Sequence, residues 1–165
     1  CSSDLENLDL INDSIGTISR VIEGIRREIL DVESMKASPL ETQIEDALLP
    51  IFTPINGEFS ITGRAPRICN DIIPHIRAVC TEASSNAVRH GKATKVDIAF
   101  ERKGAALVLT ISDNGIGVDP NAPLGHGLNN MRERAQSLGG TMKMETHDGN
   151  GAKVVWTVPH PGWST

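Results

Sequence analysis

The sequence predicts an α+β fold in which helices cover one face of a mixed β-sheet, preceded by a long N-terminal helical arm. Two observations predict these layers. In several segments, apolar residues recur with the period of a helix. Between the later helical segments lie short runs in which apolar and polar residues alternate, as is typical of strands. A third observation points to a site: eight of the 15 glycines fall between Gly115 and Gly151, where backbone can approach a ligand closely.

The arm is predicted over residues 1–33, ahead of a second domain over residues 34–165. Its apolar residues are spaced three or four apart and form one stripe with a heptad seam. A helix of about 25 residues is longer than a small domain usually needs. We therefore expect the arm to pair with another helix in a homodimer, although a surface helix packed on its own domain is the alternative. The stripe consists of Leu5, Leu8, Ile11, Ile15, Ile18, Ile22, Ile25 and Ile29.

Local signals predict the elements of residues 34–165. Pro39 suits the first turn of a short helix, which Pro50 and Pro54 are expected to end. Lys103–Gly104 is the expected turn of a hairpin, and Gly139–Gly140 is a usual helix end. The expected elements are a helix over 40–48, a strand over 58–62, a helix from near Cys69 to His90, strands over 95–101 and 105–112, a helix over 127–138, and strands over 141–146 and 152–158.

The composition excludes several classes of protein. The chain has 165 residues and a net charge of −5, with three Phe, two Trp and no Tyr. An acidic chain with few aromatic residues is a poor nucleic-acid binder, so we expect no such partner. No apolar run reaches the roughly 18–20 residues that span a bilayer. The chain begins at Cys1 without a Met, so we expect a cytoplasmic piece of a longer protein, and membrane anchoring of that parent stays open.

The first candidate site motif lies in the helix that is predicted to end near His90. Glu82, Asn86 and His90 are spaced four residues apart, which places them on one helix face. Carboxylate and amide oxygens are ligands that Mg²⁺ prefers, and Glu82 could also polarise an incoming nucleophile. Arg89 adds a cation that pairs with phosphate. The alternative is an exposed polar stripe without a ligand.

The second and third motifs contain the clustered glycines. Asp113-Asn114-Gly115-Ile116-Gly117 directly follows an apolar strand, and Gly125-His126-Gly127-Leu128 opens a helix. Free backbone N–H groups at the positive end of a helix dipole favour phosphate. An ordinary turn and a flexible loop are the alternatives for each motif alone. The three motifs together, in this order, predict a Mg-nucleotide site.

These motifs resemble the N, G1 and G2 boxes of the Bergerat-fold (GHKL) ATP-binding domain, which sensor histidine kinases share with gyrase-type topoisomerases, Hsp90 and MutL. The segment Leu128 to Ala135, with Leu138-Gly139-Gly140, is similar to histidine kinases that are paired with NarL-type response regulators. The resemblance covers about residues 68–159. The arm resembles the second helix of the dimerisation domain of those kinases.

The resemblance implies a role for each candidate residue. Asn86 would ligate Mg²⁺, and Glu82 beside it would contribute to the metal site and act as an acid–base group. Asp113 would accept a hydrogen bond from the adenine amine, and residues 118–124 would form a short lid. Ala152 departs from the family, which often has Thr there, and this weakens any adenine contact at that position. The residues expected to bind ATP are Asn86, Arg89, His90, Asp113, Gly115, Gly117, Gly125, His126, Gly127 and Leu128.

The resemblance implies a protein-histidine kinase that uses ATP and Mg²⁺ and signals to the receiver domain of a response regulator. The arm contains no His, so the phosphoacceptor histidine would lie outside this chain, and the chain alone should not phosphorylate itself. Two alternatives remain at this stage. One is an anti-sigma-factor-type serine kinase of the same fold, and the other is a non-catalytic dimerisation or regulatory module.

Overall fold

A computed structural model describes residues 39–63, 68–117, 125–146, 151–160 and 162 of the chain. The chain divides into two compact units, Cys1–Pro39 and Leu40–Thr165. The predicted arm over residues 1–33 and the predicted lid over residues 118–124 lie outside the described residues, so both remain expectations. The fold described below is that of the second unit.

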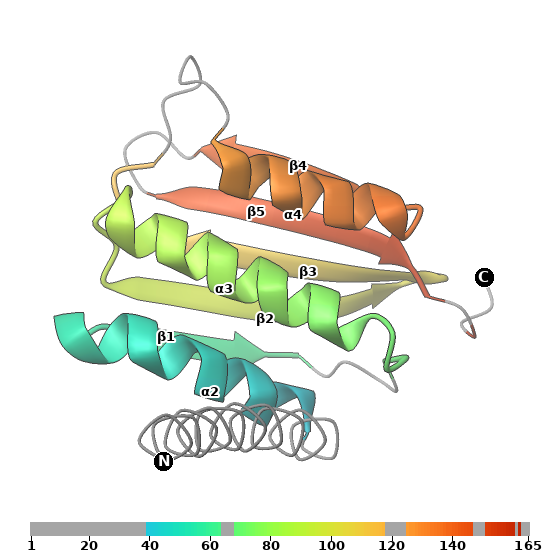
Figure 1. Cartoon of the computed structure of the whole chain (residues 1–165), viewed down its shortest axis with the longest axis horizontal. Helices are drawn as coiled ribbons and strands as arrows, with labels where there is room; N and C mark the ends of the chain where they lie inside the picture. Colours follow the sequence, from blue (N-terminus) through green and yellow to red (C-terminus); the bar gives the residue numbers. More distant parts are fainter. Residues whose placement is uncertain (1–38, 64–67, 118–124, 147–150, 161, 163–165) are drawn as a thin grey trace, which may run out of the picture. The chain divides into compact units, whose positions relative to one another are not determined.

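A mixed five-stranded sheet forms one layer of this unit (Figure 1). Its strands are β1 (Glu58–Thr62), β2 (Lys95–Lys103), β3 (Ala106–Asp113), β4 (Thr141–Thr146) and β5 (Ala152–Pro159), in the spatial order β1-β2-β3-β5-β4. β1 runs parallel to β2, and the other neighbouring strands are antiparallel. β3 therefore lies at the centre of the sheet.

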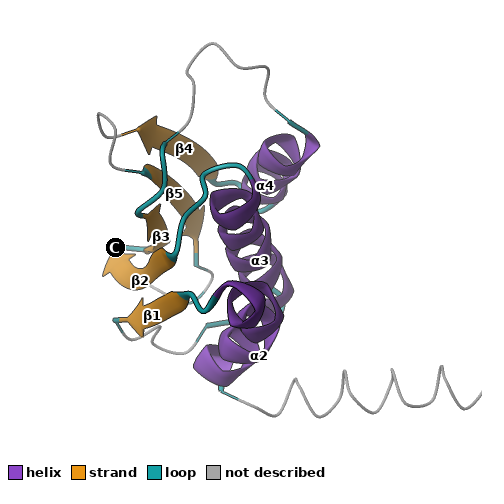
Figure 2. Ribbon diagram, turned by 90° about the vertical axis from the view of Figure 1, so that its left-hand side faces the viewer, coloured by secondary structure: helices purple, strands orange, loops and turns teal. Residues whose placement is uncertain are grey.

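Three α-helices form the second layer and cover one face of the sheet (Figure 2). They are α2 (Leu40–Phe52), α3 (Ile73–Arg89) and α4 (His126–Ser137), and a short 3₁₀ helix, η1 (Thr53–Ile55), follows α2. Alternate residues of β3, such as Leu107 and Leu109, are fully buried beneath this layer. The predicted α+β sandwich is confirmed. No helix among the described ranges has both the length and the apolar character to cross a bilayer.

Two predicted boundaries are wrong. Pro50 does not end the first helix, because α2 continues to Phe52 with Pro50 inside it. Proline removes one helical hydrogen bond, but Phe52 is only 2% exposed and its burial in the core holds the last turn in place. The hairpin turn also lies one residue later than predicted, because β2 extends through Lys103 and Gly104 adopts a φ of 60°.

Candidate functional site

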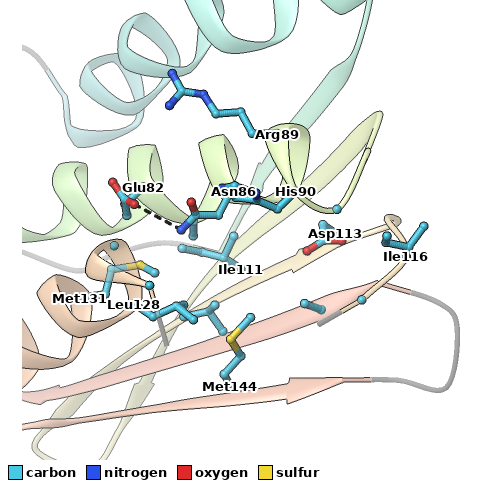
Figure 3. A pocket seen from close by; sticks show the side chains of 18 of the residues that line it. Glu82, Asn86, Arg89, His90, Ile111, Asp113, Ile116, Leu128, Met131 and Met144 are labelled. Carbon is cyan, nitrogen blue, oxygen red and sulfur yellow. Dashed lines mark hydrogen bonds between the residues drawn. The ribbon is translucent and has the colours of Figure 1, made fainter. Parts of the chain in front are cut away.

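A cleft of about 600 Å³ opens between the helical layer and the sheet (Figure 3). Its walls come from the second half of α3, the end of β3, the first turn of α4, and strands β4 and β5. Every predicted site residue lines the cleft except Gly115, which is buried behind it. The cleft therefore joins three motifs that are far apart in the sequence.

Glu82 and Asn86 lie one turn apart on α3, as their spacing predicts. The Asn86 Nδ2 donates to the Glu82 Oε1 over 3.3 Å, which leaves the Asn86 amide oxygen for another partner (Figure 3). Gly127 of α4 packs directly against this pair, because a Cβ at position 127 would collide with the Glu82 carboxylate. The absence of a side chain at Gly127 therefore leaves room for the Glu82 carboxylate beside the first turn of α4.

This donor set fits Mg²⁺ better than a metal that needs a protein cage. The described ranges hold no group of three or more His, Cys, Asp or Glu side chains placed to enclose a metal. Mg²⁺ usually keeps several waters and binds through one or two protein groups plus the phosphates of a substrate. The Asn86 amide and the Glu82 carboxylate supply hard oxygens of that kind.

At the other end of the cleft, Asp113 is the last residue of β3. Its Oδ1 accepts a hydrogen bond from the Gly115 N–H over 2.8 Å, so the loop folds back on the carboxylate. Gly151, directly before β5, packs on the same residue with a φ of 89°. A Cβ there would collide with the Asp113 carbonyl oxygen and lie 3.0 Å from Oδ1. This contact of Gly151 with Asp113 was not predicted from the sequence.

Gly91 also escaped prediction. Its carbonyl oxygen accepts a hydrogen bond from the Ile116 N–H over 2.8 Å, and a Cβ on Gly115 would collide with that same oxygen. The segment after α3 therefore supports the Asp113–Gly117 loop from behind. A glycine just after a helix is a usual end signal, but no local signal shows what its carbonyl binds.

An apolar wall separates the two ends of the cleft. Ile111, Met131 and Val154 contribute buried side chains, and Leu128 and Met144 contribute partly buried ones. Ile116 stands at the rim and is 66% exposed. A flat, uncharged ring system would find apolar contacts on both sides of this space.

The last residues of the α3 motif lie at the rim of the cleft. His90 caps the C-terminus of α3, and its N–H donates to the Asn86 carbonyl oxygen over 2.9 Å. Arg89 is exposed, and Figure 3 shows its side chain directed away from Asn86 and Asp113. An exposed arginine can change rotamer at little cost, so this position does not conflict with a ligand contact.

The first turn of α4 faces the cleft and has no side-chain cap among the described residues. Gly125 is its N-cap residue and makes no side-chain cap hydrogen bond. Helix N-termini leave N–H groups that need partners, and these attract anions. The arrangement thus combines an anion-binding helix end, a hard-oxygen pair, an apolar slot and a carboxylate.

Comparison with known proteins agrees with this arrangement. Residues 71–162, more than half of the chain, match the family described as "Histidine kinase-, DNA gyrase B-, and HSP90-like ATPase". The chain belongs to this family. All of the candidate site residues lie within the matched range of this ATPase family.

Two curated relatives of this chain are bacterial sensor proteins. The chain is 35% identical over 108 residues to the sensor histidine kinase LiaS of Bacillus subtilis. This match covers 64% of this chain and 29% of LiaS. The chain is also 29% identical over 139 residues to the sensor protein VraS of Staphylococcus aureus. That match covers 83% of this chain and 35% of VraS. The chain thus spans about a third of the length of these relatives.

Solved structures show the same fold. The ATP-binding domain of PrrB from Mycobacterium tuberculosis matches with a TM-score of 0.56 and 25% identity, over 71% of this chain and 93% of that one. The histidine kinase domain of a blue-light activated kinase from Erythrobacter litoralis matches with a TM-score of 0.62 over 76% of this chain and 63% of that one. At 19% identity, the second match supports the fold alone.

Proposed function

We propose that this chain is the catalytic ATP-binding part of a sensor histidine kinase. It binds Mg-ATP and transfers the γ-phosphoryl group to a histidine outside this chain. The observation that carries the proposal is the meeting of three motifs in one cleft: the Glu82–Asn86 pair, the Asp113 loop and the first turn of α4. Membership of the ATPase family and similarity to LiaS and VraS support the same function.

The cleft favours one orientation of ATP. Adenine fits the apolar wall, and its exocyclic amine donates to the Asp113 carboxylate, while Gly115 and Gly117 let the loop approach the ring. The phosphates extend toward the uncapped N–H groups of α4, where Gly125, His126, Gly127 and Leu128 begin the helix. This places the γ-phosphate near the Glu82–Asn86 pair, which packs against the same turn.

The chain's own residues then position the phosphates and neutralise their charge, and phosphoryl transfer requires little more than this from the protein. Asn86, with Glu82 beside it, would hold Mg²⁺, which would neutralise charge on the phosphate oxygens. Arg89 and His90 add contacts to the phosphates. A ring nitrogen of the acceptor histidine attacks the γ-phosphorus, the bond to ADP breaks, and Glu82 accepts the proton that the imidazole loses.

The partners follow from the same proposal. The arm over residues 1–33 pairs with a second copy as the trailing helix of a dimerisation domain. The phosphoryl group passes from the histidine to the receiver domain of a response regulator. The chain works on the cytoplasmic side, as part of a sensor that can be membrane-anchored.

Calorimetric titration of the full chain with Mg-ATP tests the proposal. We expect binding that weakens when Mg²⁺ is removed with EDTA, and we expect Asn86→Ala to weaken binding in Mg²⁺ but to change little in EDTA. Incubation with labelled ATP should leave the chain alone unlabelled and should label an added dimerisation domain that carries a histidine. Absence of ATP binding would favour a non-catalytic module. Labelling of a serine in a partner protein would favour the anti-sigma-factor-type kinase.

A further inference from the structure

Asn114, which follows Asp113, makes more hydrogen bonds than an exposed surface residue requires. Its Oδ1 accepts from the backbone N–H groups of Thr94 and Lys95, each over 2.9 Å. Its Nδ2 donates to the Thr94 Oγ1 over 3.1 Å. Its own backbone N–H donates to the Lys95 carbonyl oxygen over 3.2 Å. Asn114 does not line the cleft, so these bonds do not serve a ligand directly.

The bonds of Asn114 join two segments that are distant in sequence. One segment connects α3 to the start of β2, and the other is the loop that carries Asp113. A second connection lies close by, where the Ile116 N–H bonds to the Gly91 carbonyl oxygen. The loop is therefore tied down both immediately after Asp113 and again near its exposed tip.

This anchoring determines where the Asp113 carboxylate lies. Side chains alternate along a strand, so Asp113 and Asn114 leave the end of β3 on opposite sides. With Asn114 held on one side, Asp113 faces the cleft on the other, and the Gly115 N–H orients its Oδ1 over 2.8 Å. Releasing Asn114 would let the exit of β3 rotate and would move the carboxylate relative to a bound base.

We propose that Asn114 is a positioning residue that determines selectivity for adenine by fixing the Asp113 carboxylate, an inference that rests on the proposed function. Adenine carries an amine where guanine carries a carbonyl oxygen, so a correctly placed carboxylate attracts the first and repels the second. Contacts of the phosphates with α4 and Asn86 are the same for both nucleotides. Loss of the anchor should therefore weaken ATP binding and leave GTP binding nearly unchanged.

Titrations of the full chain with Mg-ATP and with Mg-GTP test this inference. We expect Asn114→Ala to raise the Kd for ATP about tenfold and the Kd for GTP by less than about twofold. Asn114→Asp should recover most of the preference, because its carboxylate still accepts from both N–H groups and the Thr94 hydroxyl can turn to donate. Asn130→Ala is the matched control, since Asn130 is exposed on α4 and does not line the cleft.

Equal loss of affinity for ATP and GTP would overturn the inference, because a general loss of structure would have that effect. Unchanged ATP binding by Asn114→Ala would overturn it as well. If the alanine variant does not fold, Asn114→Ser replaces it in the test, since serine keeps one oxygen acceptor. The change in its Kd for ATP is then compared with the change in its Kd for GTP. Failure of the unsubstituted chain to bind ATP would instead overturn the proposed function, and this inference with it.

Discussion

The two ends of the cleft are built in different ways. The Asp113 end is closely tied to its surroundings. Asn114 and Ile116 bond to backbone of the segment between α3 and β2, the Gly115 N–H donates to the Asp113 carboxylate, and Gly151, directly before β5, packs on Asp113. At the α4 end, the first turn has no side-chain cap hydrogen bond from Gly125, and the Glu82–Asn86 pair lies against Gly127. A base of fixed shape suits a preformed end, and phosphates with their metal suit an end whose donors are still available.

The largest expected effect concerns the preformed end. Asp113→Asn should raise the Kd for Mg-ATP by about a hundredfold. The Gly115 N–H will keep the amide oxygen, so the NH₂ group will face the adenine amine and two donors will meet. Calorimetric titration measures the change, and the thermal unfolding midpoint should move little. Affinity like that of the unsubstituted chain would show that Asp113 does not contact the base.

A pair of glycine substitutions distinguishes steric crowding at the Asp113 end of the cleft from backbone strain. Gly151 and Gly104 both have positive φ, but a Cβ meets Asp113 at the first position and nothing within 4 Å at the second. We expect Gly104→Ala to lower the free energy of unfolding by about 1 kcal/mol. Gly151→Ala should cost about 3 kcal/mol and also weaken ATP binding. Urea denaturation measures both, and equal losses would contradict the close packing of Gly151 on Asp113.

The open end can be tested by a second pair. Gly127→Ala places a Cβ against the Glu82 carboxylate and 3.2 Å from the Asn86 Nδ2, whereas a Cβ at Gly125 meets no described residue within 4 Å. We expect Gly127→Ala to raise the Kd for Mg-ATP about tenfold by displacing Glu82. Gly125→Ala should change it by less than about threefold, because its Cβ displaces no described side chain and its backbone N–H is kept. If both variants bind ATP equally well, Glu82 and Gly127 do not form one site.

The smallest expected effect lies outside the cleft. Burial, together with the Arg134 guanidinium, lowers the pKa of His75, whose buried Nδ1 has no hydrogen-bond partner among the described residues. A lowered pKa means that the native state binds fewer protons than the unfolded chain, so stability should fall as the pH drops below about 6.5. Arg134→Gln should raise the pKa of His75 slightly, which an NMR titration of its ring protons can follow. An unchanged or lower value would contradict the role of Arg134.

Both the successes and the failures of sequence prediction have physical causes. Glu82, Asn86 and His90 were placed on one face because helical period is a local property. Asp113 was placed at a strand end because an apolar run followed by two glycines is also local. The prediction that Pro50 ends the first helix was wrong, because the burial of Phe52 outweighs a lost hydrogen bond in the last turn of α2. No local signal could show that Asn114 binds Thr94 or that Gly151 packs on Asp113.

By itself, the sequence determined which residues are the candidates for the chemistry: the Glu82–Asn86 pair, the Asp113 carboxylate and the glycines that open α4. Composition, spacing and local propensity specify these features within a few neighbouring residues. Only the tertiary structure decided how they meet, with Gly127 against Glu82 and with Gly91, Asn114 and Gly151 around the Asp113 loop. Those contacts arise when the sheet and helices pack together, because close approach of two backbones depends on long-range packing that no short segment encodes.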